Sequence, residues 1–177
     1  GCPNKCPWCV VPMKEGGIRS YRTWGEVKRS DSERIVFMDN NVLASQHGLS
    51  QIEELGRTRI KVDFNQGLDA RLVTEDTAKL LGKINWNPYI RLACDTKSQM
   101  DSIAVAHELL LKYGVPKSKF FCYMLVRDVE DALYRAEFLR GLGIDPFAQP
   151  YIDFENKVHP TREQRDFARW VNHKATF

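Results

Sequence analysis

Three cysteines lie within the first nine residues, GCPNKCPWC, at Cys2, Cys6 and Cys9. Thiols at such close spacing can form a disulfide, attack a substrate or bind a metal. A disulfide would leave one thiol unpaired, and a nucleophile needs only one cysteine. A structural zinc site needs four ligands, and its Cys-x-x-Cys pairs usually occur twice, but no second pair follows. An iron-sulfur cluster ordinarily takes four cysteine thiolates, so three would leave one iron without a protein ligand. The loop therefore favours a cluster with one open iron.

The remaining cysteines, Cys94 and Cys122, stand alone inside apolar runs and are most simply small buried residues. A total of five, with three crowded at one end, is a poor disulfide framework and favours a reducing compartment, so we expect a cytoplasmic protein. No apolar run is long enough to cross a bilayer, so no membrane association is expected. The net charge of +3 is too mild to indicate nucleic acid, although a local basic patch would suffice for an RNA substrate.

Apolar, β-branched or aromatic runs recur after the cysteine loop, each with the length of a buried strand. They lie at 35–38, 60–64, 89–94, 120–126 and 146–152. Successive runs begin roughly 25 to 30 residues apart, which is the pitch of a strand followed by a helix. Helical patterns fill the gaps and are expected to begin at Thr74, Ser98 and Asp128, with a capping box at Thr161–Gln164 ahead of a last helix at 161–174.

This alternation predicts an α/β fold in which helices cover a mostly parallel sheet. Asp63 and Arg91 lie mid-strand between apolar neighbours, and pleating points them to the opposite face of the sheet. A sheet curled around a polar interior fits this pattern better than an open sheet that is buried on both faces. In the alternative interpretation, Asp63 and Arg91 form a structural ion pair with each other. Such a pair would not remove the polar interior.

Polar residues collect where the strand-like runs end. In barrels of alternating strands and helices, the carboxyl ends of the strands build the site. The simpler explanation is that strand ends are loops and loops are polar. That explanation is weaker for the run Asp39-Asn40-Asn41, because no helix start follows it at once. The polar strand-end positions include Asp39, Asn40, Asn41, Asn65, Gln66, Asp69, Arg71, Asp95, Arg127 and Gln149.

The loop Cys2-Pro-Asn-Lys-Cys6-Pro-Trp-Cys9, with aromatic Trp8 just before the last cysteine, resembles the cluster loop of the radical S-adenosylmethionine enzymes. The resemblance extends over nearly the whole chain, because the strand-helix units follow the loop in the order that this superfamily has them. It implies a partial (βα)6 TIM-like barrel and a 4Fe-4S cluster held by three cysteines, with S-adenosylmethionine on the fourth iron. Reductive cleavage of that cofactor would give a 5′-deoxyadenosyl radical that abstracts hydrogen from a substrate. A low-potential electron donor, a flavodoxin or a ferredoxin, is implied as partner.

The resemblance also implies roles for individual residues. Cys2, Cys6 and Cys9 would be the metal ligands, and Trp8 would pack near the adenine or shield the cluster from water. Asp39, Asn40 and Asn41 occupy the place where the family binds the cofactor's amino group, although the commoner form there is Gly-Gly-Glu. Asn65, Gln66 and Asp95 would contact the ribose, the carboxylate or the substrate, and Gln149 lies in a stretch that would contact the adenine.

One domain, a radical S-adenosylmethionine core, is expected over 1–177, with a cluster-binding loop at 1–17, βα repeats at 35–153 and a C-terminal helix at 161–174. Family members have a first strand that runs into the cluster loop, whereas this sequence starts at Gly1. The resemblance therefore implies a fragment that lacks the first strand of the barrel. The alternative function is a non-catalytic zinc- or iron-sulfur-binding module that could read RNA. Nothing in these residues names a substrate.

Overall fold

Strands and helices alternate along the chain in the computed structural model, which describes residues 1–175 and 177. The α/β class predicted from the sequence is confirmed. The strands are β1 (Arg34–Phe37), β2 (Lys61–Phe64), β3 (Asn85–Trp86), β4 (Ile90–Ala93), β5 (Phe120–Val126) and β6 (Asp145–Pro150). The helices are α1 (Val11–Glu15), α2 (Trp24–Val27), α3 (Gln46–Leu55), α4 (Glu75–Leu81), α5 (Met100–Lys112), α6 (Val129–Gly141) and α7 (Arg162–Asn172).

The strands form two parallel three-stranded sheets, which we call sheet A (β1-β2-β3) and sheet B (β4-β5-β6). The predicted partial (βα)6 barrel is therefore wrong. The short strand β3, which the sequence pattern did not indicate, pairs with β2 through Lys61 and Val62. Between the sheets, the residues that the structure describes pair only through an isolated bridge, in which the Leu68 amide donates to the Arg91 carbonyl at 2.7 Å. One bridge cannot continue the ladder from β2 into β4, so the hydrogen bonding is interrupted there.

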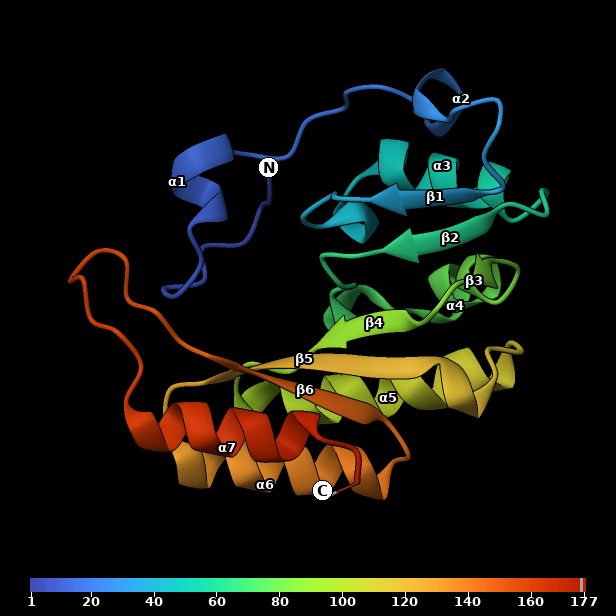
Figure 1. The fold of residues 1–177 in the computed structure, drawn as a ribbon. Coiled ribbons are helices and arrows are strands. Elements are labelled where there is room, and N and C mark those ends of the chain that lie inside the picture. The colour runs from blue at the N-terminus through green and yellow to red at the C-terminus, as the bar shows by residue number, and fades with distance from the viewer. Residues whose placement is uncertain (176) are drawn as a thin grey trace.

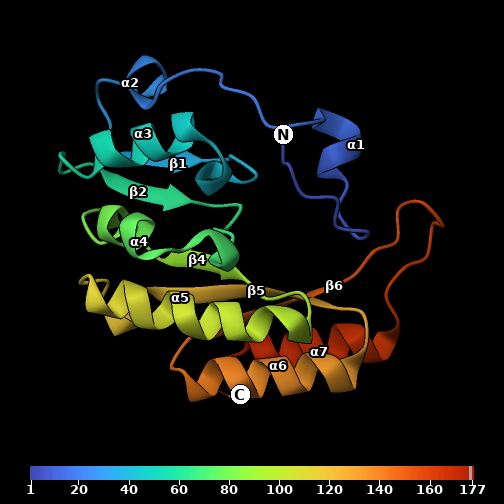
Figure 2. The same ribbon diagram turned by 180° about the vertical axis from the view of Figure 1, so that it is seen from behind.

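Helices cover one face of the sheets, as the two opposite views show (Figures 1 and 2). The covered face of β5 is fully buried through Phe120, Cys122, Met124 and Val126, whereas the intervening residues of β5 are only partly buried. Strict alternation of this kind places the apolar core between the sheets and the helices. The opposite face of the sheets carries aromatic and charged side chains.

Asp63 and Arg91 meet on that opposite face and join the two sheets. The Arg91 guanidinium donates to both carboxylate oxygens of Asp63, at 2.8 and 3.1 Å, and the Asp63 side chain is only 2% exposed. Arg34 adds a third contact to the same carboxylate at 3.3 Å. The ion pair considered from the sequence is thus present, and it lies across the gap where the ladder is broken.

All strands that pair are parallel, so their carboxyl ends lie at one edge of the molecule. The N-terminal segment with the cysteines lies at this edge, in front of the ends of β1, β2 and β4 (Figure 1). Among the described residues, no helix is both long enough and apolar enough to cross a membrane. The fold therefore brings the cysteine loop to the strand ends where the polar residues collect.

Candidate functional site

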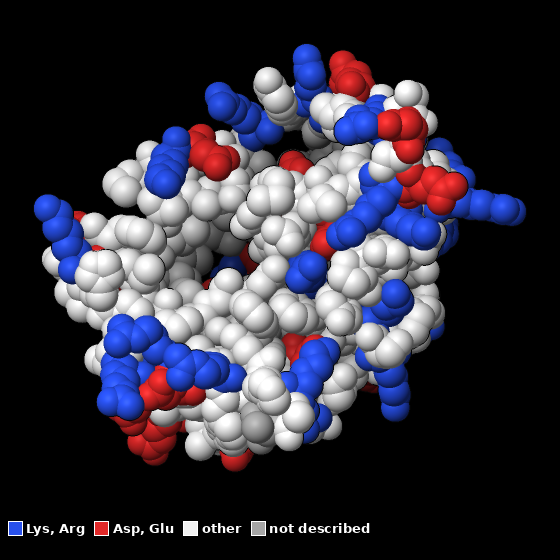
Figure 3. Space-filling model, viewed as in Figure 1, with Lys and Arg blue, Asp and Glu red and all other residues white. Residues whose placement is uncertain are grey.

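A cavity of about 490 Å³ lies between the cysteine loop and the carboxyl ends of β2, β4 and β5. The space-filling view shows this face hollowed between the N-terminal segment and the body of the molecule, with charges of both signs inside the hollow (Figure 3). Ten of the predicted site residues line the cavity: Cys2, Cys6, Trp8, Cys9, Asn40, Asn41, Asn65, Gln66, Asp95 and Gln149. Asp39 does not, and lines a neighbouring cavity of about 530 Å³ between β1 and the 15–27 segment.

The cysteine loop is closed by backbone hydrogen bonds. The Cys9 amide donates to the Cys6 carbonyl at 3.0 Å, which makes a tight turn, and the Cys2 amide donates to the Gly16 carbonyl at 3.2 Å. Cys2 and Cys6 are half-buried, Cys9 is exposed, and all three are free thiols. Among the described residues, no group of three or more His, Cys, Asp or Glu side chains is placed so that it could hold a metal ion. The thiols therefore line one cavity without forming a preassembled metal centre.

Asp69 connects the cysteine loop to the turn that follows β2. Its carboxylate accepts a hydrogen bond from the Asn4 amide at 3.0 Å and two from the Arg71 guanidinium, at 2.8 and 2.7 Å. Burial raises the pKa of Asp69, but the hydrogen bonds from Arg71 and Asn4 more than offset this, so the pKa lies below its usual value. Asp69 is therefore ionised beside the loop at neutral pH.

Arg71 supplies positive charge that acts on the Cys6 thiol. Burial raises the pKa of the Cys6 thiol, and the Arg71 guanidinium offsets part of that increase. Negative charge on Cys9 or Cys2 would raise the pKa of Cys6 further, as expected for thiols on one short loop. A cation at this place favours any negative group that the loop holds.

The three side chains of the run Asp39-Asn40-Asn41 point to different surroundings. Asp39 is exposed, and the Asn40 amide donates to Glu15 of α1 at 2.8 Å. Asn41 is only 4% exposed, and its amide nitrogen contacts the sulfur of Cys2 at 3.7 Å. Its Oδ1 is buried without a hydrogen-bond partner among the described residues. An unpaired buried acceptor is costly, so Oδ1 is the atom of this run that is suited to a donor from a bound ligand.

Sheet B contributes Asp95 and Arg127, which contact Trp8 on the far side of the cavity. The Asp95 carboxylate accepts from the Leu125 amide at 3.0 Å, and the nearby Trp8 side chain lowers its pKa. Burial raises the pKa of Asp95 and outweighs these contacts and the nearby arginines. The Arg127 guanidinium lies over the Trp8 ring, 4.7 Å from its centroid. Trp8 is therefore held by sheet B.

The other predicted residues are less constrained. The side-chain amide of Asn65 contacts the Met38 sulfur at 3.7 Å, and the backbone carbonyl of Asn65 accepts from the Tyr123 hydroxyl at 3.0 Å. Gln66 and Gln149 are exposed at the rim. These residues line the cavity without a fixed arrangement of polar partners.

Sequence reasoning assigned no role to Asn4, and it left Asp69, Arg71 and Arg127 as polar strand-end residues without a function. Arg127 could have been selected from its position directly after β5, and Asp69 and Arg71 from their place in the segment that links β2 to α4. For Asn4 no signal in the sequence distinguishes a hydrogen-bonded amide from a solvated one, because its partner lies 65 residues away.

Comparison with known proteins gave no match to a protein-family model, to a curated protein or to a solved structure. A function must therefore be inferred from the residues and from the geometry of the cavity.

Proposed function

We propose that the chain is the core of a radical S-adenosylmethionine enzyme, with Cys2, Cys6 and Cys9 as ligands of a 4Fe-4S cluster and S-adenosylmethionine in the adjoining cavity. The carrying observation is that three thiols on one loop line a cavity whose described lining residues include no fourth cysteine and no histidine. Its volume of about 490 Å³ lies within the usual range for small-molecule sites. A site of this kind provides three soft ligands together with space for a small molecule.

The donor set fits the proposed group. Three thiolates with no competing imidazole are the ligands that iron-sulfur clusters use. Arg71 offsets negative charge at Cys6, and the unpaired Oδ1 of Asn41 supports the assignment of a donor such as the cofactor's amino group to this wall. When bound, the cluster and S-adenosylmethionine would supply one-electron cleavage of the cofactor and abstraction of hydrogen from a substrate. A flavodoxin or a ferredoxin in the cytoplasm would serve as electron donor.

The roles of the protein's own residues follow from their contacts. Trp8, between Arg127 and Asp95, covers one side of the cysteine loop and keeps water from it. Asn41 orients a bound donor, and Asp69 holds Asn4 between the first two cysteines. Exclusion of water and orientation of the bound group are what a protein contributes when a cofactor carries the chemistry.

Anaerobic reconstitution with iron and sulfide tests the proposal. We expect about four iron and four labile sulfide per chain, and 5′-deoxyadenosine after addition of dithionite and S-adenosylmethionine. One zinc per chain without labile sulfide would instead support a non-catalytic zinc module. A full cluster that yields no 5′-deoxyadenosine would contradict the enzyme.

Cysteine variants provide the matched control. Cys6→Ala is expected to lose the cluster, whereas Cys94→Ala is expected to keep its iron content. Burial raises the pKa of Cys94 to about 12, so its thiol stays protonated at neutral pH and is unsuited to bind a metal. Equal loss of iron in both variants would show that the cluster does not depend on the N-terminal loop.

A further inference from the structure

The cysteine loop is not held in place by an apolar core. None of the described residues before β1 is buried, and the short helix α1 that follows the loop buries no side chain. The loop nevertheless lies against the ends of both sheets (Figure 1). Its position must therefore depend on a small number of polar and aromatic contacts. One is the contact of the Asn41 amide with the Cys2 sulfur at 3.7 Å, and two further groups hold Asn4 and Trp8.

The first group lies on sheet A and is called the sheet A anchor. It consists of Asn4, which lies between Cys2 and Cys6, together with Asp69 and Arg71. The Asn4 amide donates to the Asp69 carboxylate, which is 12% exposed. Two nitrogens of the Arg71 guanidinium donate to the same carboxylate. A hydrogen bond to an ionised acceptor is stronger than one between neutral groups, and the bidentate partner fixes the orientation of the carboxylate.

The second group lies on sheet B and is called the sheet B anchor. It consists of Trp8, which lies between Cys6 and Cys9, together with Asp95 after β4 and Arg127 after β5. The geometric contact is that of Arg127, whose guanidinium lies over the Trp8 ring, 4.7 Å from its centroid. The Trp8 side chain also lies near enough to the Asp95 carboxylate to lower its pKa. Each interval between successive cysteines therefore contains one residue that is bound to one sheet.

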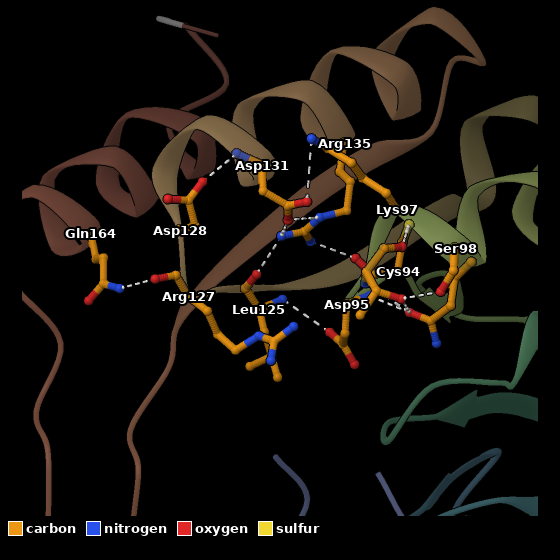
Figure 4. Close-up of polar contacts among 12 residues, drawn as sticks. Cys94, Asp95, Lys97, Ser98, Leu125, Arg127, Asp128, Asp131, Arg135 and Gln164 are labelled. Carbon is orange, nitrogen blue, oxygen red and sulfur yellow. Dashed lines mark hydrogen bonds and ion pairs between the residues drawn. The ribbon is translucent and has the colours of Figure 1, made fainter. Parts of the chain in front are cut away.

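Arg135 on α6 holds the backbone that carries Asp95 and Arg127 of the sheet B anchor (Figure 4). This side chain is 1% exposed, and it donates to the Cys94 carbonyl at 2.7 Å and to the Leu125 carbonyl at 2.8 Å. The first carbonyl directly precedes Asp95, and the second lies two residues before Arg127. Asp131 completes the set by accepting from Arg135 at 2.7 Å. One guanidinium thereby holds the backbone next to Asp95 and the backbone next to Arg127.

We propose that the spacing of the three cysteines is maintained by these two anchors, one on each sheet, and that Arg135 is the positioning residue of the sheet B anchor. Where it concerns the bound cluster, the inference rests on the proposed function, but the way in which the loop is held does not. Because the ladder between the sheets is a single bridge, the loop also spans the interruption between sheets A and B.

Hydrogen exchange in the metal-free protein tests the anchors directly. Asn4→Ala and Arg127→Met are each expected to raise amide exchange of the loop, read at Cys2 and Cys9, about fivefold, because each removes roughly one net interaction. The double variant is expected to exceed either single one, and Lys5→Ala, an exposed change within the same loop, is expected to leave exchange unchanged. Unchanged exchange in the anchor variants, or an equal rise in Lys5→Ala, would overturn the proposal.

The role of Arg135 needs a control for general destabilisation. Arg135→Lys, which keeps the charge but not the three-way geometry, is compared with Leu139→Ala, a fully buried change on the same helix. We expect Arg135→Lys to raise amide exchange, relative to wild type, more at Cys9 than at Cys2. Leu139→Ala should raise exchange at the two sites equally. The same response in both variants would reduce Arg135 to a structural residue and refute its positioning role.

Iron uptake separates this inference from the proposed function. If the wild-type chain takes up about four iron and the anchor variants take up less than half as much, both stand. If the wild-type chain binds no iron but the exchange rates respond as expected, the proposed function fails and the anchors remain. If the wild-type chain and the variants bind iron equally and show equal amide exchange, the anchor proposal is refuted and the proposed function stands.

Discussion

Asp69 and Asp95 each follow a parallel strand and each lie beside one residue of the cysteine loop, Asn4 and Trp8, yet their pKa values shift in opposite directions. The pKa of Asp69 lies below its usual value, because hydrogen bonds from Arg71 and Asn4 overcome the effect of burial. The pKa of Asp95 lies above its usual value, because burial outweighs its hydrogen bond from the Leu125 amide and the charge of Arg135. Sheet A therefore contacts the loop through an ion-paired carboxylate, and sheet B through a carboxyl group that burial dominates.

The difference comes from where the arginines direct their donors. Arg71 makes two hydrogen bonds to Asp69 itself. Arg135 instead directs its donors to two backbone carbonyls and to Asp131, so Asp95 receives only its long-range charge. An aspartate at a strand end thus acquires its electrostatic character from neighbours and not from its position after the strand.

Removal of the arginine should have the largest effect on the sheet B side. Arg135→Met removes the Arg135 donors from two backbone carbonyls and leaves Asp131 with Lys97, at 3.7 Å, as its remaining ion-pair partner, and we expect the free energy of unfolding to fall by about 3–5 kcal/mol. Arg71→Met, which removes two hydrogen bonds made by a side chain that is 45% exposed, should cost less, about 1–2 kcal/mol. Urea unfolding of both variants measures this contrast, and equal losses would show that the two sides do not differ in burial.

The ion pair between the sheets should rank next. Asp63→Asn leaves Arg91, whose side chain is 12% exposed, without its charged partner, and we expect a loss of about 2–3 kcal/mol. Asp76→Asn is the control, because Asp76 is 93% exposed and should change stability by less than about 0.5 kcal/mol. A loss in Asp63→Asn no larger than in the control would mean that the sheets do not depend on this pair.

Asp69→Asn should cost about 1–2 kcal/mol near neutral pH, because it weakens charge-assisted hydrogen bonds to Arg71 and Asn4. A carboxyl whose pKa is lowered by folding contributes stability above its unfolded pKa of about 3.9, and this contribution is lost as the pH falls through the folded pKa. The difference between wild type and variant should therefore persist from about pH 5 to pH 8 and shrink in acid. A difference that grows in acid would contradict the sign.

The smallest expected effect is the opposite pH dependence of Asp95→Asn. A carboxyl whose pKa is raised by folding binds its proton more tightly in the folded state, so stability falls as the pH rises from the unfolded pKa, about 3.9, to the folded one. The side-chain amide of the variant cannot ionise, so the variant should gain stability relative to wild type as the pH rises from about 4. Urea titrations at several pH values measure this slope, and a constant difference would contradict it.

Local signals in the sequence located most elements. Thr161 begins the last helix with the expected capping box, and Thr74 and Asp128 cap α4 and α6 through their side chains. Ser98 was wrong as the start of α5, which begins at Met100. The Gln99 side chain accepts from the Asp95 amide at 2.6 Å, and this contact holds a 3-10 turn over Lys97–Gln99 ahead of the helix.

The candidate site was predictable in its location but not in its contacts. Parallel strands bring their carboxyl ends to one edge, so polar residues that follow each strand had to lie near one another. Asp39 was the exception, because adjacent residues of the run 39–41 point in different directions and only Asn40 and Asn41 reach the cavity. The pairing of Asn4 with Asp69 joins positions 65 residues apart, beyond the reach of any local pattern.

The sequence by itself determined the supply of three neighbouring thiols, the alternation of strand and helix, and the side of the molecule on which polar strand ends collect, because these depend on residues close together in the chain. Only the tertiary structure decided that β3 takes a place beside β2, that the ladder breaks before β4, and that Asp69 and Asp95 differ in charge behaviour. Strand pairing and desolvation are set by atoms brought together from distant segments, and neither is encoded in the spacing of neighbouring residues.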